Sequence, residues 1–489
     1  KHFARTTSNI DDLRKVTVLI AESLQILGLE ELALRLINRI FTSHTHPDLY
    51  LANSNLQQDL NDKLIWINKA LKHYNLLPIK VEDAFEKSYY NGLIMKDPYN
   101  YVESNSKVSI IMPVYNRAND VSVAISSLQN QTWKNIEILV VDDCSTDDTV
   151  SVIRKHMNED SRIKLFSTPH NSGPYIARNI GLKNATGEFV TVNDGDDWSH
   201  AQKIEIQAKH LVNNPLIIAN TSEHARVTEK LQFYRRNMPG KYIFSNMSSL
   251  MFRREKVVNK IGYWDSVRFA GDGEYVRRIK KAFGPNKFIN LKTGPLSLPR
   301  QSITSLTAST EFGYHGYFRG IRKEYIENAE LFHYKRKKLF VNFPLKKRPF
   351  SIPNPMKIDK EQRRNNYDVI IGHDFRIKNT TVYDKIIEFQ KQNLKIGLVQ
   401  FYTYNLDIDR ALDSTYRNLI DGDKVQIIVW GEEVLSSSVQ LTDVALEDRQ
   451  EFIPKITTEN VGFIFTGIES SIRDLKEKAN DYLDYVELK

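Results

Sequence analysis

Two apolar runs that each end in a polar turn, KVSIIMPVYNR (107–117) and ILVVDDCSTDDT (138–149), decide the fold of this 489-residue chain. Consecutive apolar residues of this kind are typical of strands that are buried on both faces of a sheet. IKLF (163–166) and EFVTV (188–192) predict two more strands, with a helix at 174–184 between them. Alternation of strands and helices predicts an α/β domain with a mainly parallel sheet.

Polar residues follow the carboxyl ends of these strands, which is where open parallel sheets bind ligands. They are Tyr115-Asn116-Arg117, Asp142-Asp143 and Asp194-Gly195-Asp196-Asp197. Two carboxylates on either side of one glycine suit a hard divalent cation that also takes phosphate oxygens. The same D-x-D spacing recurs at 407–409 and 421–423 without a preceding buried strand, and we interpret both copies as solvated turns.

Three further carboxylates have two interpretations each. Asp143 can accept the imide N–H of a uracil on which Tyr115 stacks, or it can belong to the turn before a helix. For Asp142 the turn interpretation is favoured. Asp272, in FAGDGEYVRRI (269–279), is either a general base or a helix cap, and its spacing favours the cap.

The composition excludes several classes of protein. Hydrophobic residues are 41% and charged residues 26% of the chain, which excludes a disordered protein. No apolar run approaches the ~20 residues that a membrane-spanning helix needs. The single Cys144 cannot form an internal disulfide and disfavours a thiolate zinc site, so we expect a reducing, cytoplasmic location. The chain starts at Lys1 without methionine or signal peptide, and we expect a trimmed N-terminus.

The net charge of +8 is unevenly distributed. Residues 333–366 carry +9, residues 367–489 carry −8 and residues 1–332 carry +7. Because the basic excess is local and no nucleic-acid-binding motif accompanies it, we do not expect nucleic acid as a partner. The clusters at 335–338 and 346–348 form either a solvated hinge or a surface that holds the protein on anionic glycan or on the inner face of the cell membrane.

These patterns predict four regions: a helical scaffold or docking region (1–104), the α/β domain (105–332), a basic, proline-containing linker (333–366) and a second Rossmann-like domain (367–489). In the first region, apolar stripes at 13–20, 29–40 and 56–74 predict three helices. The last region opens with the strand YDVIIG (367–372). It has no G-x-G-x-x-G and no phosphate loop, so we predict no dinucleotide or ATP site there. We expect it to be dispensable for chemistry.

Four ordered blocks, the first two quoted above with NSGPYIARNIGL (171–182) and GEFVTVNDGDDW (187–198), together resemble glycosyltransferase family 2 over residues 106–310. The resemblance implies the GT-A fold, a nucleotide-diphosphate sugar donor (here a UDP-sugar), Mg²⁺ or Mn²⁺, and inversion of the anomeric centre. It also implies site residues: Pro113, Tyr115 and Asp143 around the base, Arg117 near the diphosphate, Arg178 in the donor pocket, Asp194 at the ribose and metal, and Asp196 as main metal ligand.

The remaining blocks carry weaker resemblances. SSLMFRREKVVNKIGYWD (248–265) resembles the acceptor half of the family. The family's acidic E-D pair reads Gly271-Asp272 here, which leaves Asp272 as the candidate base and Glu274 in reserve. THPDLYLANSNLQQDLNDKLIWIN (45–68) resembles the helical leader of bacterial surface-polysaccharide transferases. YDVIIGHDFR (367–376) resembles the start of a GT-B half, so either this domain is structural or a second half has been removed.

We therefore expect an inverting, metal-dependent glycosyltransferase acting on a hydroxyl of a bacterial surface glycan, such as a capsule, or of a lipid-linked acceptor. One alternative is a non-catalytic donor-binding scaffold of a polysaccharide-synthesis complex. The other is a sugar nucleotidyltransferase. Those enzymes normally open with a Gly-rich, Arg-containing loop, whereas this chain has PVYNRAND at that position.

Overall fold

The computed structural model describes residues 9–82, 88–235, 238–301, 313, 316–359, 365–446, 448, 450–466 and 486–488. The chain divides into two compact units. Unit 1 comprises Lys1–Trp264 and Tyr275–Ser302, and unit 2 comprises Asp265–Glu274 and Ile303–Lys489. The boundaries predicted after residues 104, 332 and 366 do not coincide with the division between these units.

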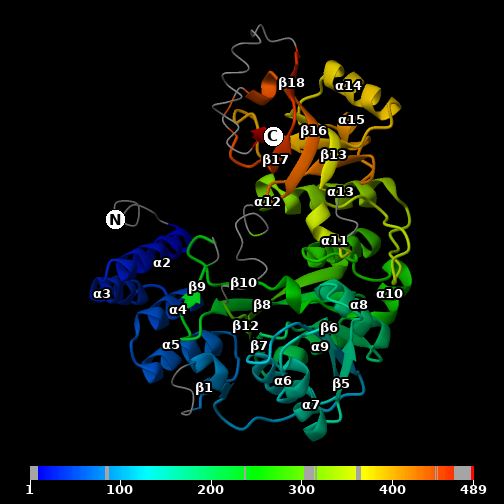
Figure 1. Cartoon of the computed structure of the whole chain (residues 1–489). Coiled ribbons are helices and arrows are strands. Elements are labelled where there is room, and N and C mark those ends of the chain that lie inside the picture. Colours follow the sequence, from blue (N-terminus) through cyan, green and yellow to red (C-terminus); the bar gives the residue numbers. More distant parts are fainter. Residues whose placement is uncertain are drawn as a thin grey trace. The chain divides into compact units, whose positions relative to one another are not determined.

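A ten-stranded sheet forms the centre of the described part of unit 1 (Figure 1). Its order is β5-β4-β3-β6-β11-β8-β12-β7, and β9 and β10 also pair with β8. The strands are β3 (Val108–Val114), β4 (Ile136–Asp142), β5 (Ile163–Ser167), β6 (Phe189–Val192), β7 (Trp198–Ser199), β8 (Ala219–Val227), β9 (Phe233–Tyr234), β10 (Ile243–Ser245), β11 (Met251–Arg253) and β12 (Phe288–Leu298). Strands β5, β4, β3 and β6 are mutually parallel, which confirms the predicted α/β fold class.

Helices follow the strands of unit 1 as the periodicity predicts. They are α6 (Val121–Gln129), α7 (Thr149–Glu159), α8 (Pro174–Asn184), α9 (Lys203–Asn213), α10 (Arg254–Ile261), α11 (Gly271–Phe283), which continues from unit 2, and the short turns η2 (Met247–Ser249) and η3 (Pro285–Lys287). Ala124 and Ile125 of α6 are fully buried in one core with Ile110 of β3 and Ile138 of β4. This packing fixes α6 on the sheet and so sets the position of the loop that follows β3.

The described part of the N-terminal region contains four helices, one more than the three predicted. It consists of α2 (Ile10–Ile26), α3 (Glu30–Phe41), α4 (Pro47–Leu56), α5 (Leu60–His73), β1 (Ile79–Val81), η1 (Tyr89–Gly92) and β2 (Leu93–Met95). Nine of the ten residues of α4 are buried. A helix that is buried all round has no polar face and therefore shows no amphipathic period. The stripe at 56–74 in fact spans the end of α4 and all of α5, which Asp59 caps through Asn61 N at 2.7 Å.

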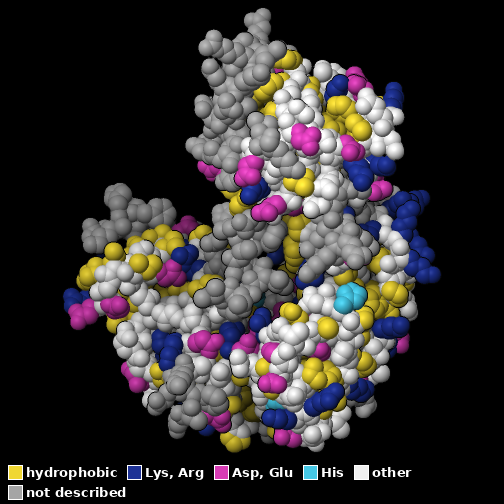
Figure 2. All heavy atoms as spheres, viewed as in Figure 1, with side chains coloured by type: hydrophobic (Ala, Val, Ile, Leu, Met, Phe, Trp, Pro, Cys, Tyr) yellow, Lys and Arg dark blue, Asp and Glu magenta, His cyan; other side chains and the backbone are white. Residues whose placement is uncertain are grey.

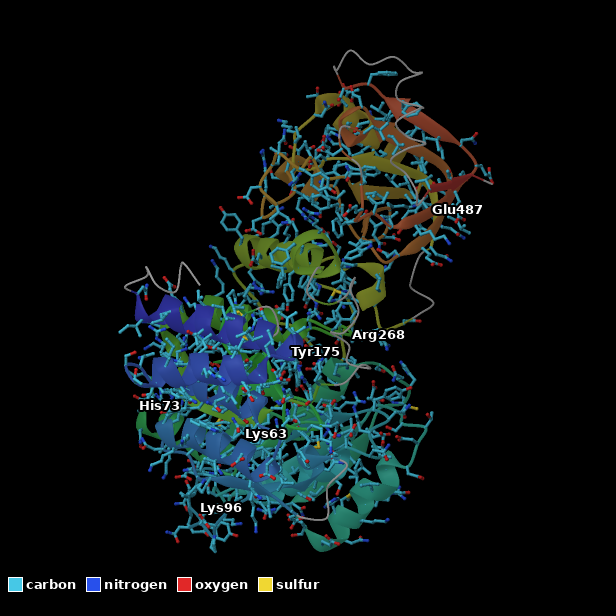
Figure 3. The ribbon with its side chains drawn as sticks, turned by 90° about the vertical axis from the view of Figure 1, so that its left-hand side faces the viewer. Lys63, His73, Lys96, Tyr175, Arg268 and Glu487 are labelled. Atoms are coloured by element: carbon cyan, nitrogen blue, oxygen red, sulfur yellow. The ribbon has the colours of Figure 1, made fainter. Side chains whose placement is uncertain are left out.

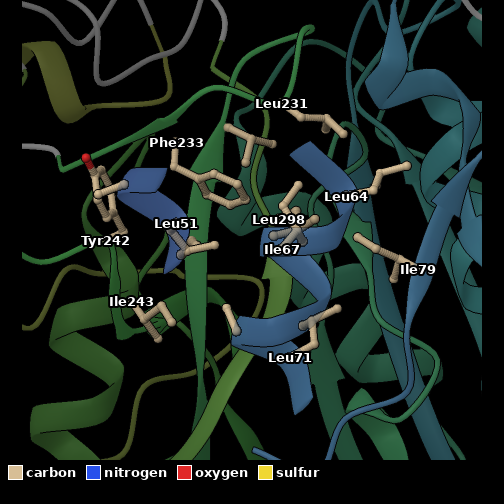
Figure 4. Packing of buried hydrophobic residues seen from close by; sticks show 14 of the residues in the cluster. Leu51, Leu64, Ile67, Leu71, Ile79, Leu231, Phe233, Tyr242, Ile243 and Leu298 are labelled. Carbon is tan, nitrogen blue, oxygen red and sulfur yellow. The ribbon is translucent and has the colours of Figure 1, made fainter. Parts of the chain in front are cut away.

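These helices share a core with the sheet of unit 1. Figure 4 shows Leu51 and Leu71 packed among Phe233, Ile243 and Leu298. Asn55 adds two hydrogen bonds to the backbone of Phe233, donating from Nδ2 at 2.8 Å and accepting at Oδ1 from the N–H at 2.7 Å. The predicted helical region is therefore part of unit 1, and its role as a scaffold or docking region stays a prediction.

The second sheet lies in unit 2, and the described strands along its main path are all parallel, in the order β15-β14-β13-β16-β17-β19. They are β13 (Asn366–His373), β14 (Ile396–Gln400), β15 (Val425–Ile428), β16 (Glu433–Thr442), β17 (Lys455–Thr458) and β19 (Val486–Leu488), with β18 (Val461–Ile464) also paired to β16. The helical elements are α12 (Gly316–Arg319), α13 (Ile321–Lys335), η4 (Asn354–Met356), α14 (Thr380–Lys391), α15 (Ser414–Arg417) and η5 (Val444–Leu446). This 3-2-1-4-5-6 strand order is that of a Rossmann-type sheet. The prediction of a GT-B half remains untested.

The basic segment after α13 is anchored within unit 2. Leu339 and Val341 are buried, and Met356 is completely buried. Arg348 Nη2 donates to Asp265 Oδ2 at 2.6 Å. The segment predicted as a linker is therefore packed against its own unit. No helix in the described part of the chain is long and apolar enough to cross a membrane.

Candidate active site

The turn Asp194–Asp197 follows β6 and lies directly against the end of β3. A Cβ atom on Gly195 would be 2.5 Å from Val114 Cγ1 and 3.2 Å from the carbonyl oxygen of Pro113. Only glycine allows the turn to come this close, because real Cβ contacts are wider. Pro113, one of the predicted site residues, thus contacts this turn through its backbone.

Two arginines bind the carboxylates of this turn. Arg117, in the loop after β3, places Nη2 3.3 Å from Asp196 Oδ2. Arg178, a buried residue of α8, donates from Nη2 to Asp194 Oδ1 at 2.8 Å. Its guanidinium lies 4.8 Å from the ring of Tyr175, which is labelled in Figure 3. The structure therefore brings together four predicted site residues, Arg117, Arg178, Asp194 and Asp196.

The three carboxylates of the acidic turn, Asp194, Asp196 and Asp197, repel one another. Burial raises the pKa of Asp196, and the carboxylates of Asp194 and Asp120 raise it as well, whereas Arg117 opposes them. Burial and then the Asp196 and Asp194 carboxylates raise the pKa of Asp197 well above its ordinary value, and Arg226 and Lys203 oppose them. A bound cation would relieve this repulsion.

The oxygen donors of the turn fit the predicted Mg²⁺ or Mn²⁺. Across the described residues, no group of three or more His, Cys, Asp or Glu side chains is arranged to hold a metal ion. Magnesium, however, is commonly held by one or two carboxylates together with water and substrate phosphates. Asp194 and Asp196 supply that number of ligands, and a donor diphosphate would supply others.

Asp143, predicted to contact a base, is buried and accepts three hydrogen bonds from the chain. Its Oδ1 accepts from Ser172 N and from Thr168 Oγ1, both at 2.8 Å, and its Oδ2 accepts from Gly173 N at 2.7 Å. In the structure the carboxylate thus holds the loop that begins α8. Tyr115, the predicted stacking residue, is 44% exposed.

The polar residues of DDCSTDDT hold the loop that carries Arg117. Ser145 Oγ accepts the N–H of Asn116 at 2.9 Å, and Thr149 Oγ1 accepts the N–H of Arg117 at 2.7 Å. Asp142 accepts the N–H of Ser145, at 3.1 Å from Oδ2, as its turn interpretation predicts. This motif therefore positions Arg117 through backbone hydrogen bonds.

A second group of residues, Tyr90 and Arg300, supports the acidic turn. The sequence analysis did not identify these two residues. Tyr90 is fully buried; its hydroxyl donates to the carbonyl of Leu298 at 2.6 Å and accepts the N–H of Trp198 at 2.7 Å. Arg300 lies 4.3 Å from the Tyr90 ring and donates to Asp120 Oδ1 at 2.8 Å. No local pattern marks Tyr90 or Arg300, because each comes from a segment remote from the motifs.

The predicted base belongs to the other unit. Asp272 is the second residue of α11 and is half-buried, and the segment Asp265–Glu274 that contains it is part of unit 2. Glu274, the reserve base, is completely buried, with Oε1 2.9 Å from His333 Nε2. His333 and Arg348 contact this segment, so a truncation before them would remove its partners. The expectation that residues 367–489 are dispensable for chemistry stays a prediction.

The other two D-x-D triplets are turns, as predicted. Asp421 Oδ1 accepts the N–H groups of Asp423 at 2.8 Å and of Val425 at 3.0 Å. Asp407 Oδ1 accepts the N–H of Asp409 at 3.0 Å. Their carboxylates serve the backbone of their own turn.

Comparison with known proteins assigns the same part of the chain to a family. Residues 109–329 match the family described as Glycosyl transferase family 2. An uncharacterized glycosyltransferase of Rickettsia conorii is 44% identical over 149 residues, 30% of this chain and 23% of that protein. The GalNAc(5)-diNAcBac-PP-undecaprenol beta-1,3-glucosyltransferase of Campylobacter jejuni is 47% identical over 92 residues, 19% of this chain and 30% of that protein. The chain spans less than a third of the length of these two relatives.

Among solved structures, Staphylococcus aureus TarS 1-349 in complex with UDP is similar, with a TM-score of 0.33 and 25% identity, covering 40% of this chain and 61% of that one. The family match begins in β3 and includes both carboxylates of the acidic turn and both of their arginines. Residues 109–329 of this chain thus form a domain that matches glycosyltransferase family 2.

Proposed function

We propose that the chain transfers a sugar, with inversion, from a UDP-sugar to a hydroxyl of a lipid-linked bacterial surface glycan. One observation carries the proposal. The ion pairs Arg117–Asp196 and Arg178–Asp194 meet on a turn that Gly195 allows to lie against the end of β3. Such an arrangement offers oxygen ligands for a cation and guanidinium donors for phosphate oxygens at one edge of a parallel sheet.

Each residue has a distinct part in this proposal. Asp194 and Asp196 would hold Mg²⁺ or Mn²⁺, which when bound supplies neutralisation of the charge on the leaving diphosphate. Arg117, half-exposed beside Asp196, binds a diphosphate oxygen, and exposed Tyr115 stacks on the base. Arg178 keeps Asp194 oriented toward the donor.

The reaction forms one bond and breaks another. The acceptor oxygen bonds to the anomeric carbon from the face opposite the diphosphate, whose bond to that carbon breaks and takes the electron pair. Asp272 accepts the proton of the acceptor hydroxyl. The exposure of Asp272, greater than that of the completely buried Glu274, supports its choice as base.

The name of the Campylobacter jejuni relative supports the acceptor class, since it specifies a sugar chain on undecaprenol diphosphate. That relative matches 19% of this chain, within the family 2 domain. A lipid-linked acceptor is therefore part of the proposal, and the sugar transferred is left to experiment.

A donor screen tests the proposal. Nucleotide-sugars are incubated with the full chain, with and without Mn²⁺ or Mg²⁺, and released nucleoside diphosphate is measured. We expect metal-dependent release from a UDP-sugar, and we expect Asp196→Ala to lower this release strongly. Asp423→Ala is the matched control, because Asp423 ends the same D-G-D triplet in a turn of unit 2. Release from no donor, or equal loss in both variants, would contradict the proposal.

A further inference from the structure

The loop that follows α13 carries a dense group of exposed cations. Between Glu330 and Asp359 the chain has no acidic residue. Six basic residues of this stretch are exposed: Lys335, Arg336, Lys337, Lys338, Lys346 and Lys347. Figure 2 shows dark-blue side chains gathered over the yellow-green loops that follow α13 in Figure 1. This basic loop, residues 335–348, is a surface that the proposed transfer reaction does not use.

The basic loop is held in place by its own apolar residues. Leu339 is 6% exposed and Val341 is 1% exposed, so the two anchor the middle of the loop in unit 2. At its start, Lys335 Nζ donates to Asn418 Oδ1 at 2.6 Å. The lysines on either side of this anchor therefore point into solvent from a fixed backbone. An ordered cationic surface of this kind needs little further ordering to bind an anionic partner.

Within the described residues, Lys337, Lys338, Lys346 and Lys347 form no ion pair with a carboxylate. Their charge is thus not neutralised by the protein. Phe340, Phe343 and Leu345 lie half-buried between the two clusters, and Pro344 is exposed. Cations interleaved with aromatic and aliphatic side chains are typical of surfaces that rest in the head-group region of a membrane.

The neighbouring groove extends the cationic surface of the loop. It has a volume of about 810 Å³, and its charged lining consists of Lys347, Arg348, Lys357 and Lys395 together with Asp421 and Asp423. The half-buried Phe340, Phe343 and Leu345 between the two lysine clusters favour a lipid surface over a soluble polyanion, because apolar side chains gain from contact with lipid.

We propose that the basic loop is an electrostatic anchor that binds the anionic phospholipid head groups of a membrane surface. The anchor would hold the chain at the membrane where a lipid-linked acceptor resides; this consequence rests on the proposed function, whereas the lipid binding does not. Clustered lysines near an anionic membrane each raise the partition coefficient on the order of fivefold, and salt screens the effect.

Vesicle sedimentation with the full chain tests the anchor. Vesicles of phosphatidylcholine alone are compared with vesicles that contain about 30% phosphatidylglycerol, at low and high salt. The test variant replaces Lys337, Lys338, Lys346 and Lys347 with glutamine. The control variant replaces four exposed lysines of unit 1 with glutamine: Lys72, Lys80, Lys96 (labelled in Figure 3) and Lys155. Both variants change the net charge equally.

We expect the wild type to bind the anionic vesicles at low salt only. The test variant should bind them at least ~100-fold more weakly, and the control variant should change less than ~5-fold. Equal losses in both variants, equal binding to neutral vesicles, or no binding by the wild type would overturn the proposal. Binding to a soluble anionic polysaccharide but not to vesicles would instead assign the loop to a glycan. Nucleoside diphosphate release without vesicles should be unchanged in the test variant, which separates failure of the anchor from failure of the proposed function.

Discussion

Replacing Gly195 with alanine tests whether the acidic turn must lie against the sheet. The new Cβ would be 2.5 Å from Val114 Cγ1, whereas apolar carbons rest about 3.5–4.0 Å apart. The turn or the end of β3 must therefore move by on the order of 1 Å. Overpacking of this kind costs about 1–3 kcal/mol. A displacement of about 1 Å in groups that hold a substrate can lower a rate about 100-fold.

We expect Gly195→Ala to lower kcat/KM for the donor found in the screen by about 100-fold and to lower Tm by roughly 2–10 °C. Val114→Ala in the same chain removes the clashing methyl groups, so the double variant should recover much of the lost activity. Val114→Ala alone should lose stability by lost packing but keep most activity. The loss of activity caused by Gly195→Ala should therefore be smaller in the Val114→Ala background than in the wild type. A double-mutant cycle measures this coupling.

Donor kinetics and thermal unfolding are measured on the wild type, on each single variant and on the double variant. If Gly195→Ala behaves like the wild type in both assays, the turn does not depend on this contact. If the double variant is as inactive as Gly195→Ala, the clash with Val114 is not the cause, and the reasoning is refuted.

Three further outcomes are expected. Asp196→Ala should weaken donor binding and turnover together. Asp272→Asn should keep donor binding in calorimetry, while its transfer rate should fall by ~10²–10⁴. A wild-type transfer rate in Asp272→Asn would mean that Asp272 is a helix cap and not the base. His333→Ala removes a hydrogen bond to completely buried Glu274 and should destabilise unit 2 by about 1–3 kcal/mol in urea unfolding, with unchanged stability as the contrary result. Burial raises the pKa of Glu432 from 4.5 to about 7. Between about pH 4.5 and 7, Glu432 therefore stays protonated in the folded state and is ionised in the unfolded state. The free energy of unfolding of unit 2 should fall by on the order of 3 kcal/mol as the pH rises through this range. Glu432→Gln should remove most of this pH dependence.

Local sequence patterns were sufficient to predict the strands and the helix at the sheet edge that carries the candidate site. Strands β3, β4, β5 and β6 and helix α8 lie within one or two residues of their predicted positions, because continuous apolar runs and the turns that end them are local signals. The same locality explains why the D-G-D triplet after a buried strand could be separated from the copy at 421–423. The resemblance to the family rests on these blocks too, and the match over 109–329 confirms it.

The pairing of side chains depended on the packed chain. Only the structure shows that the loop before α8 gives the oxygens of Asp143 three donors; its contact with a base stays a prediction. Helix α4 was not predicted, because a helix that is buried on every side shows no amphipathic periodicity in its sequence. Tyr90 and Arg300 support the acidic turn from segments about 200 residues apart in the chain, and Asp265–Glu274 joins unit 2 through residues beyond 300. Contacts between segments so distant in sequence form only when the whole core packs, since burial and complementary charge, not local propensity, select them.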